Sequence, residues 1–583
     1  MKRTLVSPNA VALGAGLLLM CLCFAPLAAP SVRVVVDGVD GEPLQNILRL
    51  LGIQALADGG EVTEARVRRH HALAPREIRQ ALEPFGYYRV EVDGNLERTG
   101  EGWLARYAIA PGPQVPIATL ELAVQGEAED DPAFQELLRA LPLRTGAPLH
   151  HPTYERAKRQ LQQLAAERGY FDARLTRSEV RVDLDRYQAA VHLVLDSGPR
   201  YRFGEVRFES TVVREALLQD FVPFAPGDPY DSAQLLELNN GLLDSDYFAQ
   251  VEVRPRTDHA DGLTVPIEVQ LTARERSRYS VGLGYGTDTG ARASLGLERR
   301  YVNTRGHRFL AELQISEIRT GFRTRYDIPV RDPRTDRVFV QARYTEEEVD
   351  VSSSDAAEVA IGLEQRLGFW RQAFTLTYLQ SDFTIGDQVG SSALLMPGAR
   401  WERLKADDPV YPSHGSRVGL DVRGASEAVL SETSFLQARL FGKWVRRLGS
   451  DGRVLFRADV GSTWVDEFAA LPPEVRFFAG GDVSVRGYGY NTLGPENADG
   501  DVIGGRHLVV GSIEYEHRLA PDWSGAVFYD IGNAVDAFGD DLESGVGVGV
   551  RWRSPVGWVR VDVAKPLDED EDVRLHLRIG PDL

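Results

Sequence analysis

This chain has little cysteine, and it has no long apolar run after its first thirty residues. The 583-residue sequence has two cysteines, and both, Cys21 and Cys23, lie near the N-terminus. The rest of the chain therefore has no disulfide framework, and ordinary cores and lipid must stabilise it. A membrane-spanning helix needs about 20 consecutive apolar residues. The lack of such a run argues against a helical membrane protein.

Positive charge is scarce relative to negative charge. The sequence has 66 Lys and Arg residues against 85 Asp and Glu residues, a formal net charge of −19. A general nucleic-acid binder needs a basic surface, so we expect no nucleic-acid partner. Acidity also keeps many proteins soluble, and the net charge alone therefore defines no function.

The N-terminus has the layout of a secretory signal. Lys2 and Arg3 precede an apolar stretch at 11–24, and small residues at 26–29 offer a cleavage site. We expect residues 1–29 to be a signal peptide, with an uncleaved anchor as the alternative. The remaining length is too great for one hydrophobic core, so the sequence predicts several domains.

A repeat of roughly 80 residues organises the first half of the chain. Three similar tetrapeptides each end a helical pattern and precede alternating apolar and polar residues. They stand at 85–88, 168–171 and 245–248. We predict three α+β units in which the order is strand, helix, helix, strand, strand. Their predicted boundaries are 30–114, 115–199 and 200–273.

The repeat also predicts where equivalent residues lie. One tyrosine of each unit should stand between its second helix and its second strand. These residues are Tyr87, Tyr170 and Tyr247. The first unit is the least regular, and its polar stretch at 58–71 predicts a loop.

From about residue 278 the pattern has period two and never reverts to helix. Val281, Leu283 and Tyr285, for example, alternate with glycine. Segments of about ten residues with one apolar face match the strands of a membrane barrel. About sixteen such segments follow one another, and even strand numbers are the rule. We predict a transmembrane β-barrel at 274–583. A soluble propeller, the alternative, would need a repeated blade signature that we do not find.

Three charges are predicted to meet inside this barrel. Arg486 lies in a long connection at 478–505, among glycine and aromatic residues. Strand alternation places Glu514 and Asp530 opposite the apolar residues of their strands, so both should face the lumen. Arg486 can then bridge both acids and fix the loop. The alternative is three charges that are solvated independently.

No group of residues predicts catalysis or metal binding. The glycines at 545–549 alternate within a strand, whereas a dinucleotide-binding loop must open a helix. The histidine pairs at 70–71 and 150–151 have no further Cys or His partners. We therefore expect no enzyme activity, no cofactor and no bound metal.

Several stretches resemble a known family. They are 284–288, 477–482, 485–488, 511–515, 545–557 and 579–583. Together with the three repeats, they resemble the TamA family, the outer-membrane subunits of the translocation and assembly module. This family belongs to the wider superfamily of POTRA-domain barrel insertases that includes BamA. The resemblance implies three periplasmic POTRA domains, followed by a sixteen-stranded barrel in the outer membrane of a Gram-negative bacterium.

The resemblance also implies a function and its residues. The chain would be a non-enzymatic insertase for clients such as autotransporters. Its partners would be a TamB-like protein anchored in the inner membrane, unfolded outer-membrane clients and the lipid bilayer. The implied lumen-loop motif is Val485, Arg486, Gly487 and Tyr488, with Glu514 and Asp530 as its barrel-wall partners. The implied lateral gate between the first and last strands involves Val281, Gly282, Gly284, Leu575, Leu577 and Ile579.

Two other functions remain open. A two-partner secretion transporter has a similar barrel and loop, although it typically carries two POTRA units and a plug helix. A passive pore, or a periplasmic scaffold with a barrel anchor, belongs to a different class. Ion conductance compared with the rate of client insertion distinguishes these functions.

Overall fold

The computed structural model describes residues 31–100, 102–209, 212–349, 352–408, 411–554, 557–568 and 572–579. The expected signal peptide at 1–29 lies outside the described residues. The chain divides into two compact parts, 1–201 and 202–583, and each is described by itself. In the described ranges, no helix has both the length and the apolar character needed to cross a bilayer.

The first α+β unit is a three-stranded sheet covered by helices. Its sheet has the order β1-β3-β2, in which β3 pairs parallel with β1 and antiparallel with β2. Its elements are β1 (Ser31–Asp37), α1 (Gly41–Leu50), α2 (Gly52–Ala57), α3 (Glu64–Leu82), η1 (Glu83–Phe85), β2 (Glu91–Thr99) and β3 (Gly102–Ala110). Ile47, Ile78 and Tyr107 are buried between helices and sheet, so this unit has its own core.

The prediction of a loop at 58–71 is wrong for its second half. Helix α3 begins at Glu64, and the side chain of Thr63 accepts a hydrogen bond from the Arg66 backbone N–H, which caps the helix. Val67, Ala74 and Ile78 form the buried stripe of α3. The residues around this stripe are polar because they face solvent, which is the ordinary pattern of an amphipathic surface helix.

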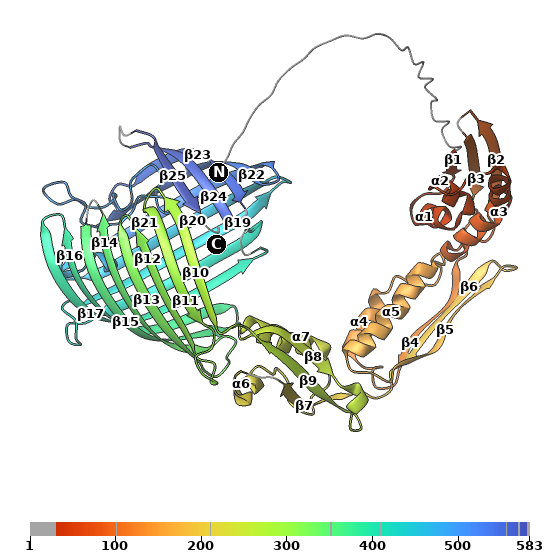
Figure 1. Ribbon diagram of the computed structural model, residues 1–583, viewed down its shortest axis with the longest axis horizontal. Helices are drawn as coiled ribbons and strands as arrows, with labels where there is room; N and C mark the ends of the chain where they lie inside the picture. The colour runs from red at the N-terminus through yellow and green to blue at the C-terminus, as the bar shows by residue number, and fades with distance from the viewer. Residues whose placement is uncertain are drawn as a thin grey trace, which may run out of the picture. The chain divides into compact units, whose positions relative to one another are not determined.

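The second unit repeats this architecture in the same part of the chain. Its sheet has the order β4-β6-β5, and α4 and α5 lie against one face of it (Figure 1). Its elements are β4 (Ile117–Gln125), α4 (Pro132–Ala140), α5 (His151–Glu167), β5 (Arg174–Asp183) and β6 (Gln188–Asp196). The side chains of Asp131 and His150 cap α4 and α5. A local capping role therefore accounts for His150, the first residue of the second histidine pair.

The third unit belongs to the second part of the chain and has the same strand order, β7-β9-β8. Its elements are β7 (Arg202–Glu209), α6 (Glu215–Gln219), α7 (Ser232–Asp244), β8 (Phe248–Pro255), η2 (Thr257–His259) and β9 (Thr264–Ala273). The prediction of three α+β units is thereby confirmed. The exact boundaries drawn between them stay a prediction.

The junction of second helix and second strand is where the three units differ. Tyr87, Tyr170 and Tyr247 each lie between the last α-helix and the second strand of their unit. In the first unit this is the third helix, α3, because the unit has one helix more than the predicted order of strand, helix, helix, strand, strand. The residue before the tyrosine has a left-handed backbone, with φ of +83° at both Gly86 and Gly169 and +61° at Asp246. Glycine adopts this conformation freely, whereas another residue accepts it at a cost of about 1 kcal/mol or more.

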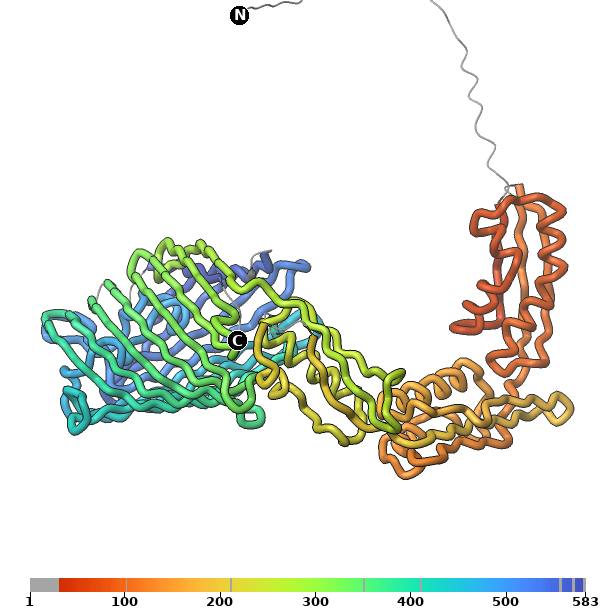
Figure 2. The backbone as a smooth tube through the Cα atoms, turned by 60° about the horizontal axis from the view of Figure 1, so that its bottom comes forward, coloured from red at the N-terminus to blue at the C-terminus, as the bar shows by residue number. Residues whose placement is uncertain are grey.

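The remaining strands form one sixteen-stranded antiparallel sheet that follows chain order from β10 to β25. The prediction of a sixteen-stranded barrel is confirmed. The strands are β10 (Ser277–Gly286), β11 (Gly290–Arg299), β12 (Arg308–Ser316), β13 (Arg319–Pro329), β14 (Arg337–Val349), β15 (Ser352–Leu367), β16 (Trp370–Ile385), β17 (Gln388–Ala406), β18 (His414–Ala425), β19 (Phe435–Leu448), β20 (Gly452–Val465), β21 (His507–Ala520), β22 (Trp523–Val535), β23 (Glu543–Ser554), β24 (Gly557–Pro566) and β25 (Arg574–Ile579). Figure 2 shows them side by side in this order.

The two faces of this sheet have opposite chemistry. Apolar side chains such as Leu295, Val527 and Val548 are more than half exposed on the outside. The inner face of the sheet includes buried charged side chains, such as Glu514 and Asp530. A sheet that is apolar outside and charged inside suits a bilayer around it and a polar lumen within it.

Candidate functional site: the lumen loop and the barrel seam

The long connection at 466–506, between β20 and β21, packs against the inner face of the barrel wall. Phe477, Val485, Tyr488 and Leu493 of this connection are buried in one apolar cluster with Leu508, Val510 and Ala534 of the wall. We call this segment the lumen loop. Its apolar residues anchor it, and its polar residues make directional contacts with the wall.

Glycines permit the close approach of loop and wall. Gly487 has a φ of +108°, and a Cβ atom there would lie 3.0 Å from the backbone nitrogen of Pro566. A Cβ on Gly545 would lie 2.0 Å from the carbonyl oxygen of Arg486. The alternating glycines at 545–549 therefore make room for the loop at their first position, which agrees with the prediction that they are not a nucleotide-binding turn.

Arg486 is the centre of the charged site. Its Nε lies 2.7 Å from Asp530 Oδ2, its Nη2 lies 3.0 Å from Asp530 Oδ1, and its Nη1 lies 2.7 Å from Glu514 Oε2. The backbone N–H of Arg486 also donates to Asp530 Oδ2, at 3.1 Å. The structure brings together the three charges that the sequence placed in the lumen, and it rules out independently solvated charges.

The surroundings of this ion pair are dry. Asp530 is fully buried and Arg486 is 6% exposed. The guanidinium carbon of Arg486 lies 3.3 Å from the centre of the Phe528 ring, so the cation is stacked on an aromatic face. Charges taken out of water need partners on every side, because an unpaired buried charge is strongly destabilising.

A second arginine, which sequence reasoning missed, completes the site. Arg551 is fully buried, and its guanidinium lies 2.7 Å from Glu514 and 2.5 Å from Asp562. Asp562 also lies 3.1 Å from Arg486 Nη1. Strand alternation in β23 and β24 was the signal that could have placed Arg551 and Asp562 in the lumen. The result is an interlocked network in which Arg486 and Arg551 share Glu514 and Asp562.

The backbone beside the loop motif is hydrogen-bonded to the wall, as the side chain of Arg486 is. Arg457, on β20, donates to the carbonyl oxygens of Val483 and Ser484. The hydroxyl of Tyr488 donates to Glu543, at 3.2 Å. The segment 483–488, which contains the motif, is thus bound to strands β20 to β24 of the wall. This arrangement can fix one loop conformation.

The first and last strands of the sheet, β10 and β25, face each other across a seam without a hydrogen-bonded ladder among the described residues. Side chains make the connection instead. The backbone N–H of Leu577 donates to the Thr287 hydroxyl at 3.1 Å, and this hydroxyl donates to Asp482 Oδ1, also at 3.1 Å. The seam therefore depends on a lumen-loop carboxylate.

His576 makes the same link from the last strand. Its Nε2 accepts a hydrogen bond from the backbone N–H of Gly487 at 3.0 Å, so its Nδ1 carries the proton and donates to Asp482 Oδ1 at 2.6 Å. The backbone N–H of Asp482 donates to Asp288 Oδ2 at 2.7 Å. We call Thr287, Asp288, Asp482 and His576 the seam clasp. It joins β10, β25 and the lumen loop in one network.

Three members of the clasp have the chemistry of metal ligands. Ligand atoms of Asp288, Asp482 and His576 lie within 4.8 Å of one another. Burial, and then the neighbouring carboxylate of Asp482, raises the pKa of Asp288 to about 6. A cation at Nδ1 of His576 would need the lone pair that now carries a proton, and Nε2 already accepts from Gly487. The hydrogen bonds therefore use the atoms that a metal would require.

The residues predicted for the gate lie on the two seam strands. Val281 is 74% exposed on β10, and Leu575 is 56% exposed on β25. The backbone N–H of Leu577 donates a hydrogen bond to the Thr287 hydroxyl, and Ile579 is the last residue of β25. Gly282 and Gly284 stand opposite Ser294 and Arg292 of β11, whose side chains occupy the space that a Cβ would need. These glycines thus make room for lumen side chains as well as weakening the strand.

Thr287→Val should loosen the seam without disturbing the turn. Valine has the shape of threonine, but it neither accepts from Leu577 nor donates to Asp482. Each lost hydrogen bond is worth about 0.5–1.5 kcal/mol, so amide exchange at Leu577 should accelerate roughly two- to tenfold. Thr289→Val in the same turn is the matched control, because its hydroxyl has no hydrogen-bond partner in the described part of the chain. Equal exchange at Leu577 in both variants would remove Thr287 from the clasp.

Three α+β units before a sixteen-stranded barrel with a loop in its lumen define a class, the outer-membrane barrels with periplasmic POTRA domains. Comparison with protein families gives the same result. The Omp85 superfamily domain matches residues 262–582, more than half of the chain, and the chain belongs to this superfamily. The model of POTRA domain 1 of TamA matches residues 33–111, so the first unit is of the TamA type. A surface-antigen repeat model for POTRA domains matches 134–198 and 201–274.

Individual relatives are more distant. The chain is 23% identical over 392 residues to the outer membrane protein assembly factor BamA of Nitratidesulfovibrio vulgaris, a match that covers 63% of this chain and 48% of that protein. The chain thus spans about half the length of this relative. It is also 23% identical over 525 residues to BamA of Neorickettsia risticii, which covers 83% of this chain and 68% of that protein.

A solved structure supports the fold. The crystal structure of Haemophilus ducreyi BamA lacking POTRA domains 1–3 superposes with a TM-score of 0.68 at 17% identity, over 80% of this chain and 99% of that one. Membership of the Omp85 superfamily makes the chain a non-enzymatic membrane protein. Its barrel lies in the outer membrane, and its three POTRA units lie in the periplasm.

Proposed function

We propose that this protein inserts client β-barrels into the outer membrane, and that clients enter through a lateral gate between β10 and β25. The observation that carries the proposal is the seam, which has no backbone ladder among the described residues and is closed by side chains of the clasp. Unpaired strand edges are costly in lipid, and an incoming strand can satisfy them. A barrel with such an edge can therefore template a client strand.

The lumen loop has a defined part in this proposal. The ion pairs of Arg486 hold the loop against the wall, and the clasp joins the same loop to both seam strands. A closed seam and a docked loop therefore stabilise each other. Opening the gate would break the few bonds of the clasp, whereas opening any other strand pair would break a complete ladder.

The TamA-type first unit supports a finer proposal about clients and partners. We propose that autotransporters are among the clients, and that the periplasmic units bind a TamB-like protein anchored in the inner membrane. Co-purification of such a protein with the full-length chain from native membranes tests the second statement, and its absence from the complex would contradict it.

Reconstitution tests insertion directly. Vesicles that contain the purified protein should fold an added, unfolded autotransporter β-domain faster than empty vesicles do, as measured by heat-modifiable mobility and protease resistance. Their ion conductance should stay low, because the lumen loop occupies part of the barrel interior. Vesicles with an unrelated closed barrel serve as the control for a general effect of protein in the bilayer.

The two alternative functions predict other results in this experiment. A passive pore would conduct ions and leave folding of the client unchanged. A two-partner secretion transporter would move a soluble passenger into the vesicle lumen, and the passenger would not fold in the membrane. Either result would contradict the proposed function.

A further inference from the structure

The third POTRA unit breaks a rule that the first two units keep. In those units a glycine with a left-handed backbone precedes the repeat tyrosine, whereas the third unit has Asp246 there with a φ of +61°. Aspartate accepts this conformation less readily than glycine. A strained residue persists when the structure around it compensates for the strain.

Two arginines provide that compensation. Asp246 Oδ2 accepts from Arg300 Nε at 2.7 Å, and Asp246 Oδ1 accepts from Arg274. Arg274 follows β9 of the third unit, whereas Arg300 follows β11 of the barrel. The Arg300 side chain is only 9% exposed, so water does not screen its ion pair with Asp246 as it would at an open surface. One carboxylate therefore ties the third unit to the first hairpin of the barrel.

Neighbouring residues strengthen the same joint. The Tyr247 hydroxyl donates to the carbonyl oxygen of Gly306, at 2.6 Å, in the turn between β11 and β12. Gly306 has a φ of +74°, and a Cβ there would lie 2.7 Å from the Tyr247 hydroxyl. In the second unit the equivalent Tyr170 donates to Asp131 of its own unit. Tyr247 thus makes its hydrogen bond to the barrel, whereas Tyr170 makes its hydrogen bond within its own unit.

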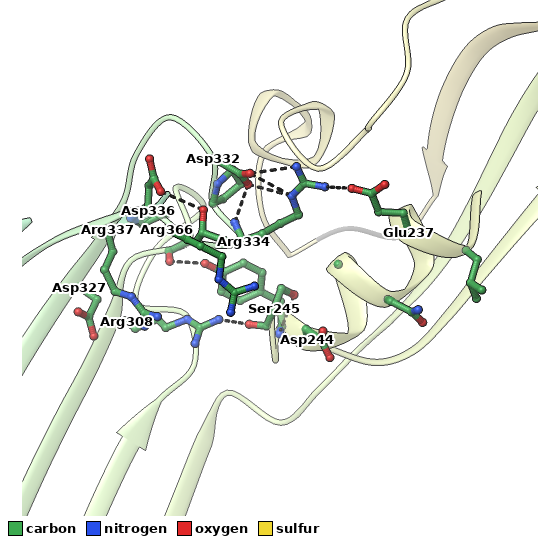
Figure 3. Close-up of a pocket in the computed structure, with 18 of the residues that line it drawn as sticks. Glu237, Asp244, Ser245, Arg308, Asp327, Asp332, Arg334, Asp336, Arg337 and Arg366 are labelled. Carbon is green, nitrogen blue, oxygen red and sulfur yellow. Dashed lines mark hydrogen bonds and ion pairs between the residues drawn. The ribbon is translucent and has the colours of Figure 1, made fainter. Parts of the chain in front are cut away.

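Figure 3 shows the other side of this joint, around a cavity of about 650 Å³. Arg308, the first residue of β12, donates to the carbonyl oxygen of Ser245. Arg334, in the turn between β13 and β14, pairs with Glu237 of α7 at 2.7 Å. Two periplasmic turns of the barrel are therefore bound to the third unit.

We propose that Asp246 is a positioning residue that makes the third POTRA unit and the hairpin β10–β11 one rigid body. Because β10 is also a seam strand, a movement of the third unit is transmitted to β10, which is one edge of the gate. The consequence for the gate rests on the proposed function, whereas the rigid joint itself does not.

Distance measurements test the joint. Spin labels on Ala216→Cys in α6 and Asp522→Cys in the turn between β21 and β22 report the position of the third unit against the barrel, and both sites are exposed. The native cysteines, Cys21 and Cys23, precede the described residues and can be replaced. We expect a narrow distance distribution by pulsed EPR in the otherwise unchanged protein and a clearly broader one in Asp246→Gly. Equal widths would overturn the proposal.

Further variants separate the ion pair from the backbone and from misfolding. Asp246→Asn keeps a residue that tolerates the left-handed backbone but removes the charge, and it should also broaden the distribution. Arg300→Gln changes only the barrel side and should have the same effect as Asp246→Asn. Arg254→Ala removes an exposed ion pair with Glu252 inside the third unit, and it should leave the width unchanged. If Arg254→Ala also broadened the distance distribution, the broadening would reflect a general loosening of the third unit, and the proposal would be contradicted.

Insertion assays test the consequence for the gate. Asp246→Gly should slow client insertion several-fold while the thermal stability of the barrel is retained. Broader distances with normal insertion would contradict the transmission of movement to the gate. A complete lack of insertion by the unchanged protein would contradict the proposed function, and the EPR result would still decide the joint.

Discussion

Arg486→Ala should destabilise the folded barrel by about 3–5 kcal/mol, the usual cost of removing one partner of a buried ion pair. The reason is the burial of its partners, because Asp530 is fully buried and would lose its main cation. Glu514 and Asp562 would keep their ion pairs with Arg551 but lose those with Arg486. The midpoint of unfolding in guanidinium chloride measures this loss, and hydrogen exchange at 483–490 should show that the lumen loop is released.

Two variants control this experiment. Arg486→Lys keeps the positive charge but cannot reach Asp530 and Glu514 with a planar fork, so we expect an intermediate loss. Arg518→Ala removes an arginine whose ion pair with Asp451 is exposed, with 54% of the Arg518 side chain accessible. An exposed pair is worth about 0–1 kcal/mol, so this change should have little effect. If Arg486→Ala proved as mild as Arg518→Ala, the ion-pair cluster would not be what holds the loop.

A crosslink across the seam should stop client insertion completely while the barrel remains folded. Tyr285 and Leu577 lie on the outer face of the seam strands, and a short thiol crosslinker between Tyr285→Cys and Leu577→Cys would hold β10 against β25. The physical reason is that a client strand can pair only with an edge that is free. Insertion is measured in vesicles before crosslinking, after crosslinking, and after reduction of a cleavable reagent, which should restore it.

The matched control is a crosslink between two strands that already share a ladder. Leu295 and Leu313 are direct register partners on β11 and β12. Joining Leu295→Cys to Leu313→Cys restricts a strand pair that has no reason to open, so insertion should continue. Full insertion with the seam crosslink complete would exclude the lateral gate, and it would favour a pore or a scaffold.

The class of fold and the faces of its strands follow from the order of the residues alone. Period-two alternation is a local property, and it placed Glu514 and Asp530 in the lumen without any knowledge of their neighbours. The same alternation, summed over the second half of the chain, indicated sixteen strands. Repeat spacing placed Tyr87, Tyr170 and Tyr247 at equivalent junctions. Each of these inferences needs only residues that are close in the chain.

Local patterns predict secondary structure less reliably where a polar stretch can be either a loop or the solvent-exposed part of a helix. The polarity of the stretch at 58–71 predicts a loop, yet its second half is the first part of helix α3, in which Val67 is buried and the polar residues face solvent. Only the burial of Val67 against the rest of the core distinguishes a solvated helix from a loop. The glycines of β10 had a similar ambiguity, since packing against Ser294 and Arg292 accounts for them as well as strand weakness does.

Contacts between residues of distant strands follow from the folded chain and not from local patterns. Alternation tells which face a side chain occupies, but not its height along the barrel or its neighbour on another strand. Arg551 and Asp562 therefore stayed unnoticed beside Arg486. The seam clasp joins Asp288, Asp482 and His576, which are far apart in the chain and meet because the sheet curves back on itself. The role of Asp246 likewise depends on Arg300, because the ion pair with this barrel residue compensates for the strained backbone of Asp246.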